Sequence, residues 1–580
     1  MTITDNSPNL NDRIDELSDK RKRLLAQLIG NSDDSGRVYE SPKNELEKKL
    51  ATIWQKTFNK ALIGRHENYF ALGGDSLSSI RITAQASLLG MNIKMQDLIK
   101  HPTIAQLAEY LDETGGDTQL TIASTDKESR WTYLFSDKEQ SRYPLTPIQF
   151  GILYHCKMEP KSPLYISQLQ CEFTGEFDTK IFHSALLCVI QRFPGVRAAF
   201  PPELVAEQSF TISGIDTLPA GVYEVDNEEN SLADVAELAQ LEREKGFDLE
   251  NPPLMRFKIL NIGSSRFSCI WTLHHLILDG WSQEIVLEEL FAAYSRLSQG
   301  QDLPAKAVTY AQWNTSFHQA LAPKAAAYWQ AHLAGYNLQN DYALLLPKRS
   351  TGALSNIEQN DEFSLELNFT DFPILWFSEQ QGITPCAVML SALFLALFKT
   401  VQCKDSLIGT ILSGRNCMDG ERVDEAVGNF INCLPFRCKI EETNSLLELY
   451  LSCKEDFLNL MEYEGNSIRQ IQEWSGLPGL SESLNTLFVY ENFKGVHELN
   501  QVGLPISIEN VQFNIMEHYP IVVTALQSTE SMRVVMRVRN SLVRTEKVKQ
   551  LWSNFCRVFE TGLWLKHDQS MNTVLLELGN

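Results

Sequence analysis

The sequence has little of what marks secreted, membrane-spanning or nucleic-acid-binding proteins. Its 580 residues carry 73 acidic and 51 basic side chains, for a formal net charge of −22. Binding to nucleic acid or anionic lipid depends mainly on Lys and Arg neutralising phosphate, so neither partner is expected. The N-terminus has no apolar segment typical of a signal peptide, and the longest apolar run, residues 386–398, is too short to span a bilayer. We therefore expect a cytoplasmic location and no membrane.

Paired cysteines are also missing. The 11 cysteines are scattered, with no CxxC pair and no Cys/His spacing suited to zinc. Neither a metal site nor a disulfide framework is expected. The composition, 43% hydrophobic and 21% charged, is that of an ordinary globular protein with large packed cores.

A chain of this length is too long for a single core, and about three or four domains are expected. Residues 1–38 are polar, with one helical stretch and then a Ser/Asp/Gly break, which predicts a helical or flexible N-terminal segment. Residues 39–112 have a helical pattern, and residues 113–142 read as a polar linker. Strand-like runs then alternate with amphipathic helices, which indicates α/β structure in two lobes, at 143–312 and 313–575.

The helical part begins with an amphipathic helix. Ser41 is its expected N-cap, with Pro42 in the first turn. Leu46, Leu50 and Trp54 recur at helical spacing, so they are expected in the core. The part as a whole reads as a small helical bundle.

Ser76 stands where two glycines meet the start of a later helix, in ALGGDSLSSI. Gly73 and Gly74 permit a sharp turn that leaves the Ser76 hydroxyl at the helix start. The unpaired N–H groups and partial positive charge there favour a bound or attached phosphate. Serine is also a common N-cap, so the residues alone leave a phosphate-bearing role and a purely capping role open.

With its surroundings, this stretch resembles the peptidyl carrier proteins of non-ribosomal peptide synthetases. The resemblance rests on ENYFALGGDSLSSIRI, with GGDSL at its centre, in a four-helix pattern from ELEKKLATIW to HPTIAQLAEYL. It implies a small four-helix-bundle carrier domain in which Ser76 bears a covalent 4′-phosphopantetheine, attached by a phosphopantetheinyl transferase. The thiol of that arm would hold an aminoacyl or peptidyl thioester.

Two histidines and an aspartate form a second candidate site, in LHHLILDGWS. A strand delivers His274 and His275 to its end, where adjacent side chains point in different directions, so only one is expected in a shared cavity. Histidine handles protons near neutral pH, and Asp279 could orient an imidazole or pair with a buried arginine. Gly280 permits a turn into a helix expected to begin near Ser282. A core histidine pair or a metal pair would also fit the dipeptide, although no further ligand cluster lies nearby.

HHLILDG fits the HHxxxDG signature of condensation domains, which share the two-lobed α/β fold of chloramphenicol acetyltransferase. Further segments agree in order along the chain: YPLTPIQFGILYH, QRFPGVRAAF, TYAQWN, SGRN, VGNFINCLPFR, IRQIQEWSGL and LNTLFVYENF. The resemblance covers residues 143 to about 570. Phe193 stands where the family usually has histidine, but outside the active-site motif, so inactivity does not follow.

The resemblance implies roles for five residues. His275 is the central active-site histidine, close to the attacking amine and the thioester, while His274 and Gly280 shape its loop. Asp279 is mainly structural and pairs with an arginine, for which Arg415 of SGRN is the candidate. The implied enzyme is a peptide-bond-forming acyltransferase. Whether His275 acts as a base or positions substrate stays open.

The implied partners lie outside this chain. The sequence has no adenylation signature and no GxSxG thioesterase elbow, so an upstream adenylation module is expected to load the carrier. The acceptor would come from another carrier protein or a free amine. Whether the chain is free-standing or a piece of a larger synthetase stays open.

Two alternatives and one subtype remain. LTPIQFGILYH and HHLILDGWS resemble condensation domains that take a D-configured donor. An epimerisation domain shares the fold and a histidine motif, although DGWS and FINCLP favour condensation. A non-catalytic platform that recruits other enzymes is the other alternative, and the intact His275, Asp279 and Gly280 argue against it.

Overall fold

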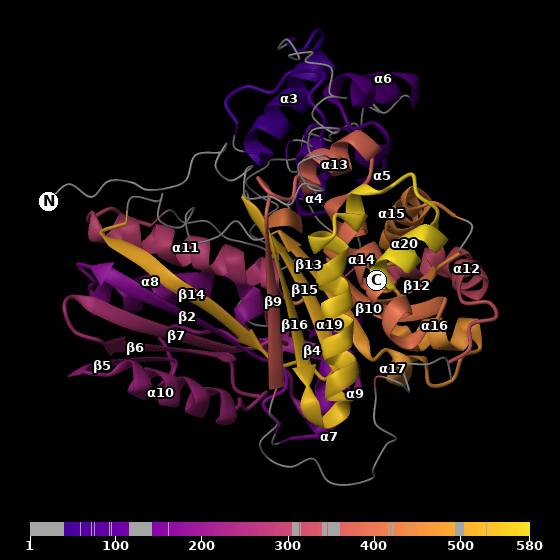
Figure 1. The fold of residues 1–580 in the computed structure, drawn as a ribbon. Coiled ribbons are helices and arrows are strands. Elements are labelled where there is room, and N and C mark those ends of the chain that lie inside the picture. Colours follow the sequence, from indigo (N-terminus) through magenta and orange to yellow (C-terminus); the bar gives the residue numbers. More distant parts are fainter. Residues whose placement is uncertain are drawn as a thin grey trace, which may run out of the picture.

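A small helical domain and two larger lobes make up the part of the chain that the computed structural model describes (Figure 1). The described residues are 40–114, 142–303, 312–338, 345 and 360–579, with gaps at 59, 71, 73, 75, 92, 94, 161, 314, 416–417, 420–422, 442–443, 493–503 and 529. The expected N-terminal segment 1–38 and nearly all of the expected linker 113–142 lie outside the described residues, as does Gly73.

The helical domain closes around aromatic and aliphatic side chains. Trp54 is fully buried, and its ring meets those of Phe58 and Tyr69 edge to face, at centroid distances of 6.0 and 5.7 Å. Leu50 and Ile82 join this core from two different helices. The described helices here are α3 (Glu45–Thr57), α4 (Ser76–Leu88), α5 (Met95–Lys100) and α6 (Ile104–Thr114).

Asn44, and not the expected Ser41, caps α3. Its side chain accepts a hydrogen bond from the backbone N–H of Glu47 at 2.7 Å, and the Glu47 carboxylate accepts one from the backbone N–H of Lys43 at 2.7 Å. Glu47 also forms an ion pair with Arg65 at 2.7 Å. These bonds satisfy backbone N–H groups around Asn44, so the helix starts later than the Ser-Pro pair suggested.

The first lobe is built on a five-stranded sheet in the order β14-β2-β7-β6-β5, with only β5 and β6 parallel. Successive side chains of a strand point to opposite faces. On β7, Trp271 therefore packs in the cluster formed with α8 and α11, and Ile270 packs in the cluster formed with α10. Both faces are covered, so this strand is buried at its centre. The bounds are β1 (Arg142–Pro144), α7 (Pro147–Met158), β2 (Ile166–Gly175), α8 (Thr179–Arg192), η2 (Pro194–Arg197), β3 (Ala198–Ala199), α9 (Pro202–Ala206), β4 (Ser209–Ile212), β5 (Tyr223–Glu229), α10 (Leu232–Glu244), β6 (Met255–Asn261), β7 (Arg266–His274) and α11 (Gly280–Ser298).

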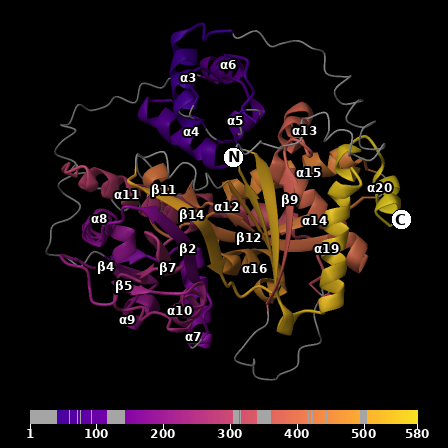
Figure 2. The ribbon, with the colours of Figure 1, turned by 60° about the vertical axis from the view of Figure 1, so that its left-hand side comes forward.

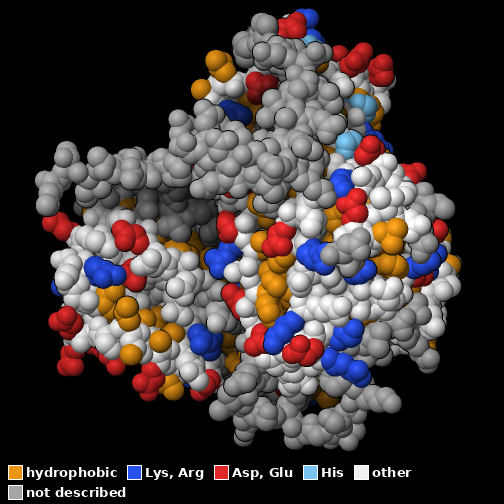
Figure 3. Space-filling model, viewed as in Figure 1, with side chains coloured by type: hydrophobic (Ala, Val, Ile, Leu, Met, Phe, Trp, Pro, Cys, Tyr) orange, Lys and Arg blue, Asp and Glu red, His pale blue; other side chains and the backbone are white. Residues whose placement is uncertain are grey.

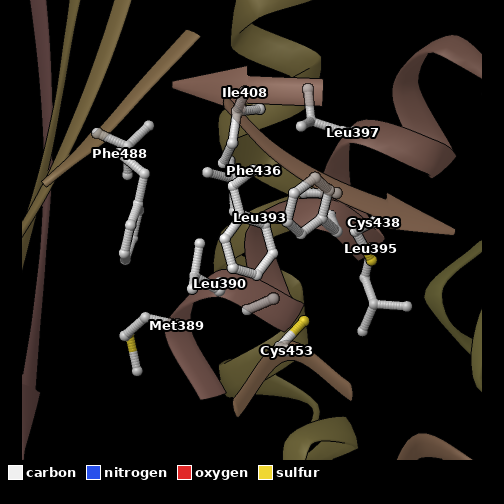
Figure 4. Packing of buried hydrophobic residues seen from close by; sticks show 14 of the residues in the cluster. Met389, Leu390, Leu393, Leu395, Leu397, Ile408, Phe436, Cys438, Cys453 and Phe488 are labelled. Carbon is white, nitrogen blue, oxygen red and sulfur yellow. The ribbon is translucent and has the colours of Figure 1, made fainter. Parts of the chain in front are cut away.

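The second lobe is built on a six-stranded sheet in the order β12-β10-β13-β15-β16-β9. One face packs against α14 and α19, where Leu393, Phe436 and Phe488 meet (Figure 4). The other face turns toward the first lobe and contacts Ile148 of α7. The bounds are β8 (Gln312–Trp313), α12 (Thr315–His332), β9 (Asn360–Asn368), α13 (Ile374–Gln381), α14 (Pro385–Val401), β10 (Asp405–Leu412), β11 (Met418–Asp419), η5 (Val423–Glu425), β12 (Asn432–Lys439), α15 (Leu446–Glu462), α16 (Ile468–Ser475), α17 (Leu480–Ser483), β13 (Thr486–Asn492), β14 (Ile506–Ile515), β15 (Ile521–Gln527), β16 (Ser531–Arg539), η6 (Asn540–Leu542), α19 (Thr545–Glu560), η7 (Leu563–Leu565) and α20 (Met571–Gly579).

The longest apolar run of the sequence forms α14. Every residue of this helix except Lys399 is buried, and the side chains pack into the core of the second lobe. Among the described residues, no single helix has the length and apolar character needed to cross a bilayer. Only α13 and α14 taken together would pass on those grounds, with a bend of 100° between them.

Strand β14 departs from the expected division at residue 312. It belongs by sequence to the second lobe, yet it pairs with β2 at the edge of the first lobe's sheet, with Ile508 opposite Phe173. Figure 2 shows this strand beside β2, on the side of the first lobe. The two lobes are therefore joined by a strand exchanged between them as well as by the chain connection. On the face in Figure 3, acidic and basic side chains are interspersed and do not form a continuous basic patch.

Candidate active site

The two histidines lie at the end of β7, where the strand enters a short loop that leads into α11. The backbone N–H of His274 donates to the Leu254 carbonyl at 2.9 Å, and that of His275 donates to the Tyr165 carbonyl at 2.8 Å. These bonds fix the two residues between the neighbouring strands β6 and β2. Among the described residues, no group of three or more His, Cys, Asp or Glu side chains is arranged to hold a metal ion.

His274 is buried and held in one tautomer. Its Nδ1 accepts a hydrogen bond from the backbone N–H of Leu276 at 3.2 Å, so the ring proton sits on Nε2, 3.6 Å from Cys156 Sγ. Burial, with a smaller contribution from the neighbouring His275, lowers the pKa of His274 to about 3. The ring is neutral at all working pH values, and it packs at the end of the strand.

His275 differs because its ring remains partly exposed. Its Nδ1 lies 2.6 Å from the Leu278 carbonyl oxygen, so Nδ1–H donates there and the lone pair is left on Nε2. Burial lowers the pKa of His275, against the opposing effects of the Leu278 bond and the Asp279 charge. The site thus presents a neutral, oriented imidazole that can accept a proton.

Asp279 is fully buried and caps α11. Its Oδ1 accepts from the backbone N–H of Ser282 at 2.8 Å and lies 3.3 Å from Arg415 Nη2, while its Oδ2 accepts from the backbone N–H of Phe430 at 3.0 Å. Arg415 is also fully buried, and its Nη1 donates to the carbonyls of Val423 and Ala426. The structure brings these two residues together as a pair that ties the histidine loop to the segment before β12.

Residues 426–430 hold the other side of the loop. The Asn429 side chain donates to the His275 carbonyl at 2.5 Å, and the Gly428 carbonyl accepts from both Asp279 N–H and the Ser282 hydroxyl. Sequence reasoning included these residues in the VGNFINCLPFR and DGWS segments but gave them no role. Their backbone partners depend on tertiary packing, which a single sequence does not display.

Gly280 sits at the exposed first position of α11, two residues earlier than the expected helix start. A Cβ added there would lie 3.1 Å from Oε1 of Glu491, a residue of β13 that sequence reasoning also left without a role. Loss of surrounding water raises the pKa of Glu491, and Asp279 raises it further. The same effect raises the pKa of the nearby Glu517 to about 7, although Arg537 opposes the shift.

Both glutamates keep contact with solvent. Glu491 is exposed and Glu517 is partly exposed, even though both lose enough surrounding water to shift their pKa values. The Glu491 carboxyl group lies beside Gly280, at the start of α11.

Tyr165, whose carbonyl holds His275, adopts an unusual backbone conformation. Its φ of 63° lies in the left-handed region, which is unfavourable for a tyrosine. Its N–H donates to the Met516 carbonyl at 2.8 Å, and its hydroxyl lies 2.6 Å from His518 Nδ1. His518 stacks on His155 at a centroid distance of 4.1 Å, and burial lowers its pKa to about 3. These contacts fix the residue that positions His275.

Phe193 lies in the core of the first lobe. It is 2% exposed and follows α8, just before η2. Gly195 in η2 packs so closely on the 426–430 segment that a Cβ would lie 2.1 Å from the Val427 carbonyl oxygen. This segment of the sequence therefore supports the site through its backbone and not through an aromatic or imidazole group.

Ser76 is the first residue of α4 in the helical domain. Gly74, two residues earlier, has no room for a side chain, because a Cβ would lie 2.4 Å from the Tyr69 carbonyl oxygen and 2.5 Å from its ring. The close approach explains why glycine stands before the helix, and it sets the start of the helix at Ser76. A 13-residue helix that begins there suits an attached phosphate.

Two family models match the chain. The model described as Condensation domain matches residues 139–574, and the model described as Phosphopantetheine attachment site matches residues 48–111. The first range contains both lobes and the histidine loop, and the second contains Ser76.

Relatives and solved structures agree with these matches. Surfactin synthase subunit 1 of Bacillus subtilis (strain 168) is 26% identical over 553 residues, which is 93% of this chain and 14% of that protein. Tyrocidine synthase 3 of Brevibacillus parabrevis is 24% identical over 546 residues, which is 90% of this chain and 8% of that protein. The chain thus spans a small part of these relatives.

The solved structures share the fold of the two lobes. The starter condensation domain of rhizomide synthetase, solved in complex with C8-CoA, has a TM-score of 0.61 at 17% identity and covers 75% of this chain and 97% of that one. The first condensation domain of the calcium-dependent antibiotic synthetase has a TM-score of 0.58 at 15% identity, over 75% of this chain and 99% of that one.

Proposed function

Because the chain belongs to the condensation-domain family, with a phosphopantetheine attachment domain ahead of it, we propose that it forms amide bonds in non-ribosomal peptide synthesis. The observation that carries the proposal is the state of His275. Its imidazole is neutral, partly exposed and oriented by the Leu278 carbonyl, in the loop of the first lobe that contacts Asn429 and Phe430 of the second. Such a group can hold an amine and take up its proton.

The residues around Ser76 fit a phosphopantetheine arm, because the Gly74 approach sets this serine at the start of α4. When bound, the arm supplies a thiol that carries the donor acyl group as a thioester. Ser76 would form the phosphodiester through its hydroxyl. The backbone N–H groups and the partial positive charge at the start of α4 would stabilise the phosphate charge.

His275 is the residue that we assign to the acceptor amine. An amine N–H that donates to Nε2 is held in one orientation. As the amide bond forms and the C–S bond of the thioester breaks, Nε2 can receive the proton that the amine loses and pass it to the departing thiolate. A free α-amino group has a pKa of about 7.7–8.0, so a fair fraction is already neutral near pH 7.5 and a strong base is not needed. Orientation and a modest proton-accepting role therefore suffice.

The other residues of the motif support His275 and do not react. Asp279 and Arg415 hold the loop through their ion pair and the bonds to Ser282 and Phe430. Buried ionic groups of this kind need each other, because either one alone would be an uncompensated charge in the interior. His274 anchors the strand end. Gly280 leaves room beside the Glu491 carboxyl group.

The partners follow from the two domains. A phosphopantetheinyl transferase would modify Ser76, an adenylation module would load the arm, and a second carrier protein or a free amine would bring the acceptor. We further propose a D-configured donor, on the strength of the LTPIQFGILYH and HHLILDGWS segments. The excess of acidic over basic side chains disfavours a nucleic-acid partner, and we propose a cytoplasmic setting.

The test loads the full chain with an acyl donor, adds an acceptor-loaded carrier protein, and follows amide formation by intact-protein mass spectrometry. We expect His275→Ala to lower coupling by about 10²–10⁴-fold, the range of general acid–base contributions, while loading persists. Ser76→Ala should prevent loading. The exposed His183 of α8 gives a matched control, since His183→Ala should couple like the wild type. Undiminished coupling by His275→Ala would refute the assignment.

The same sample separates condensation from epimerisation. An epimerase exchanges the α-hydrogen of the donor with solvent in the absence of any acceptor. We expect no deuterium from D2O at the α-carbon of the loaded donor, either before or after the acceptor is added. Deuterium uptake that depends on His275 but not on acceptor would favour the epimerisation reading.

A further inference from the structure

The helical domain is seated on the second lobe. In both ribbon views, α4 and α5 form the side of the helical domain that faces the lobes (Figures 1 and 2). Ile99 of α5 packs against the core cluster of the second lobe, and Lys454 Nζ lies 5.8 Å from the ring centroid of Phe70. A small cavity along this seam is lined from both sides, by Tyr69, Phe70 and Ile99 of the helical domain and by Pro385, Lys454 and Tyr490 of the second lobe.

A second contact lies at the start of α11, next to the candidate active site. The guanidinium carbon of Arg81, on α4, lies 5.7 Å from the ring centroid of Trp281. The guanidinium carbon of Arg415 lies 4.4 Å from the centroid of the same ring. The short helix η5, which Arg415 holds through the Val423 carbonyl, also contacts α4.

These contacts form one connected path from the helical domain to the histidine loop. Arg81 belongs to the helix that Ser76 begins, five positions further along. Trp281 follows Gly280 in the first turn of α11, and Arg415 joins the same turn to η5 through Asp279. A guanidinium over an aromatic face is attracted by the negative face of the ring, and the attraction grows when the pair is removed from water.

We propose that Trp281 is the docking anchor by which this condensation domain holds its own carrier domain, and that Arg81 is the carrier residue that engages it. The inference rests on the proposed function, since it takes the helical domain to be the donor carrier. It adds the pair of residues by which the two domains of this chain engage each other. A carrier with a neutral residue at the position of Arg81 lacks this contact, so the condensation domain binds it less well.

The chemistry of the contact explains why it depends on a cation. Arg415 already lies over the Trp281 ring, and its charge is offset by the buried Asp279 carboxylate. Trp281 is therefore held in place before the carrier arrives. A second cation is attracted by the ring face, while an apolar side chain at position 81 would gain only contact area.

The experiment compares Arg81→Gln, Arg81→Lys and Trp281→Leu in the full chain with Lys56→Gln, which makes the same charge change on the exposed end of α3. Each protein is loaded to completion with excess transferase, as judged by intact mass. Single-turnover coupling is measured with the donor on Ser76, and separately with the same acyl group on free pantetheine. Hydrogen exchange of the unloaded proteins is followed in peptides that contain Val423–Glu425 and the first turn of α11.

We expect Arg81→Gln to slow coupling of the carrier-bound donor by about fivefold to thirtyfold and to leave the free donor unaffected. Exchange at η5 should rise in Arg81→Gln and in Trp281→Leu, while Arg81→Lys should keep most of the wild-type rate and protection. Lys56→Gln should match the wild type throughout. Wild-type rates and protection in Arg81→Gln, or equal slowing of both donors, would overturn the docking inference.

These outcomes are distinct from failure of the proposed function. If the wild type couples both donors in a His275-dependent way and Arg81→Gln does so equally fast, only the docking inference fails. If the wild type couples neither donor, the proposed function fails, while the exchange data still report whether the helical domain is seated through Arg81.

Discussion

The two adjacent histidines at the end of β7 hydrogen-bond in opposite ways through Nδ1, because their surroundings differ. His274 accepts a backbone N–H on Nδ1 and turns its Nε2–H toward a thiol, so no lone pair is left for a substrate. His275 donates from Nδ1 to a carbonyl, so its lone pair stays on Nε2. The alternation of side chains along a strand predicts that only one of the two can face a shared cavity. Which nitrogen bears the proton depends on carbonyls that fold next to it, and that could not be predicted.

The lowered pKa of His275 leads to a prediction about how the coupling rate falls as the pH is lowered, which is the acid limb of the pH–rate profile. A histidine whose pKa is lowered below 6.5 keeps its lone pair near neutral pH, so over pH 7–9 the acceptor amine should be the group that titrates. With two acceptors whose amine pKa values differ by about one unit, the midpoint of the limb should move by about one unit. Single-turnover coupling rates across this range measure it. A limb fixed above pH 6.5 for both acceptors would show instead that the histidine itself titrates there.

The raised pKa of Glu517 leads to a prediction about stability. In the unfolded chain a glutamate has a pKa of about 4.3, whereas Glu517 in the folded protein has a pKa of about 7. Between these two pH values the folded state therefore binds more protons than the unfolded state. Stability contributed by this group is therefore lost as pH rises through that window. Glu517→Gln removes the loss, so its melting temperature should exceed that of the wild type at pH 8 but not at pH 4. Melting curves at both pH values test it, with the exposed Glu530→Gln expected to show no such difference.

At the scale of elements, the start of α11 depends on the Asp279 carboxylate, which binds Ser282, Phe430 and Arg415 at the same time. The sequence predicted a strand, a turn and a helix here, and the helix begins within two residues of the expected position. The pairing of Asp279 with Arg415 joins residues 136 positions apart, and only the family motif pointed to it. The hydrogen bonds that join Asp279 to Phe430 and Gly428 could not be predicted from residue types, because both partners are backbone atoms.

The buried Asp279–Arg415 pair should respond differently to single and double substitution. Arg415→Met leaves the carboxylate without its cation in a dry interior, so we expect a loss of about 3–5 kcal/mol in the free energy of unfolding. Asp279→Asn combined with Arg415→Met removes both charges and keeps a side-chain oxygen for the helix cap, so the double variant should be more stable than Arg415→Met. Urea unfolding of the four proteins gives the coupling energy. Simple additivity of the two single effects would contradict a mutually compensating pair.

At the scale of the whole molecule, strand β14 makes the two lobes interdependent. Its residues follow β13 of the second lobe in sequence, yet they complete the sheet of the first. The alternation of strands and helices predicted the α/β lobes, but the order of strands in a sheet is set by long-range pairing that no local pattern shows. The helical domain has a core of its own around Trp54, so its stability should not depend on β14.

Shortening one side chain on β14 should therefore weaken both lobes and spare the helical domain. Ile508 is 2% exposed and packs in the core of the first lobe, so Ile508→Ala should cost about 2–5 kcal/mol. Because the strand pairs with β2 and lies in the sequence between β13 and β15 of the second lobe, hydrogen exchange should rise in β13 as well as in β2, with the helical domain unchanged. Ile53→Ala, at an equally buried position in the helical domain, should raise exchange there alone. If Ile508→Ala loosened only the first lobe, β14 would be an added edge strand and not a joint between the lobes.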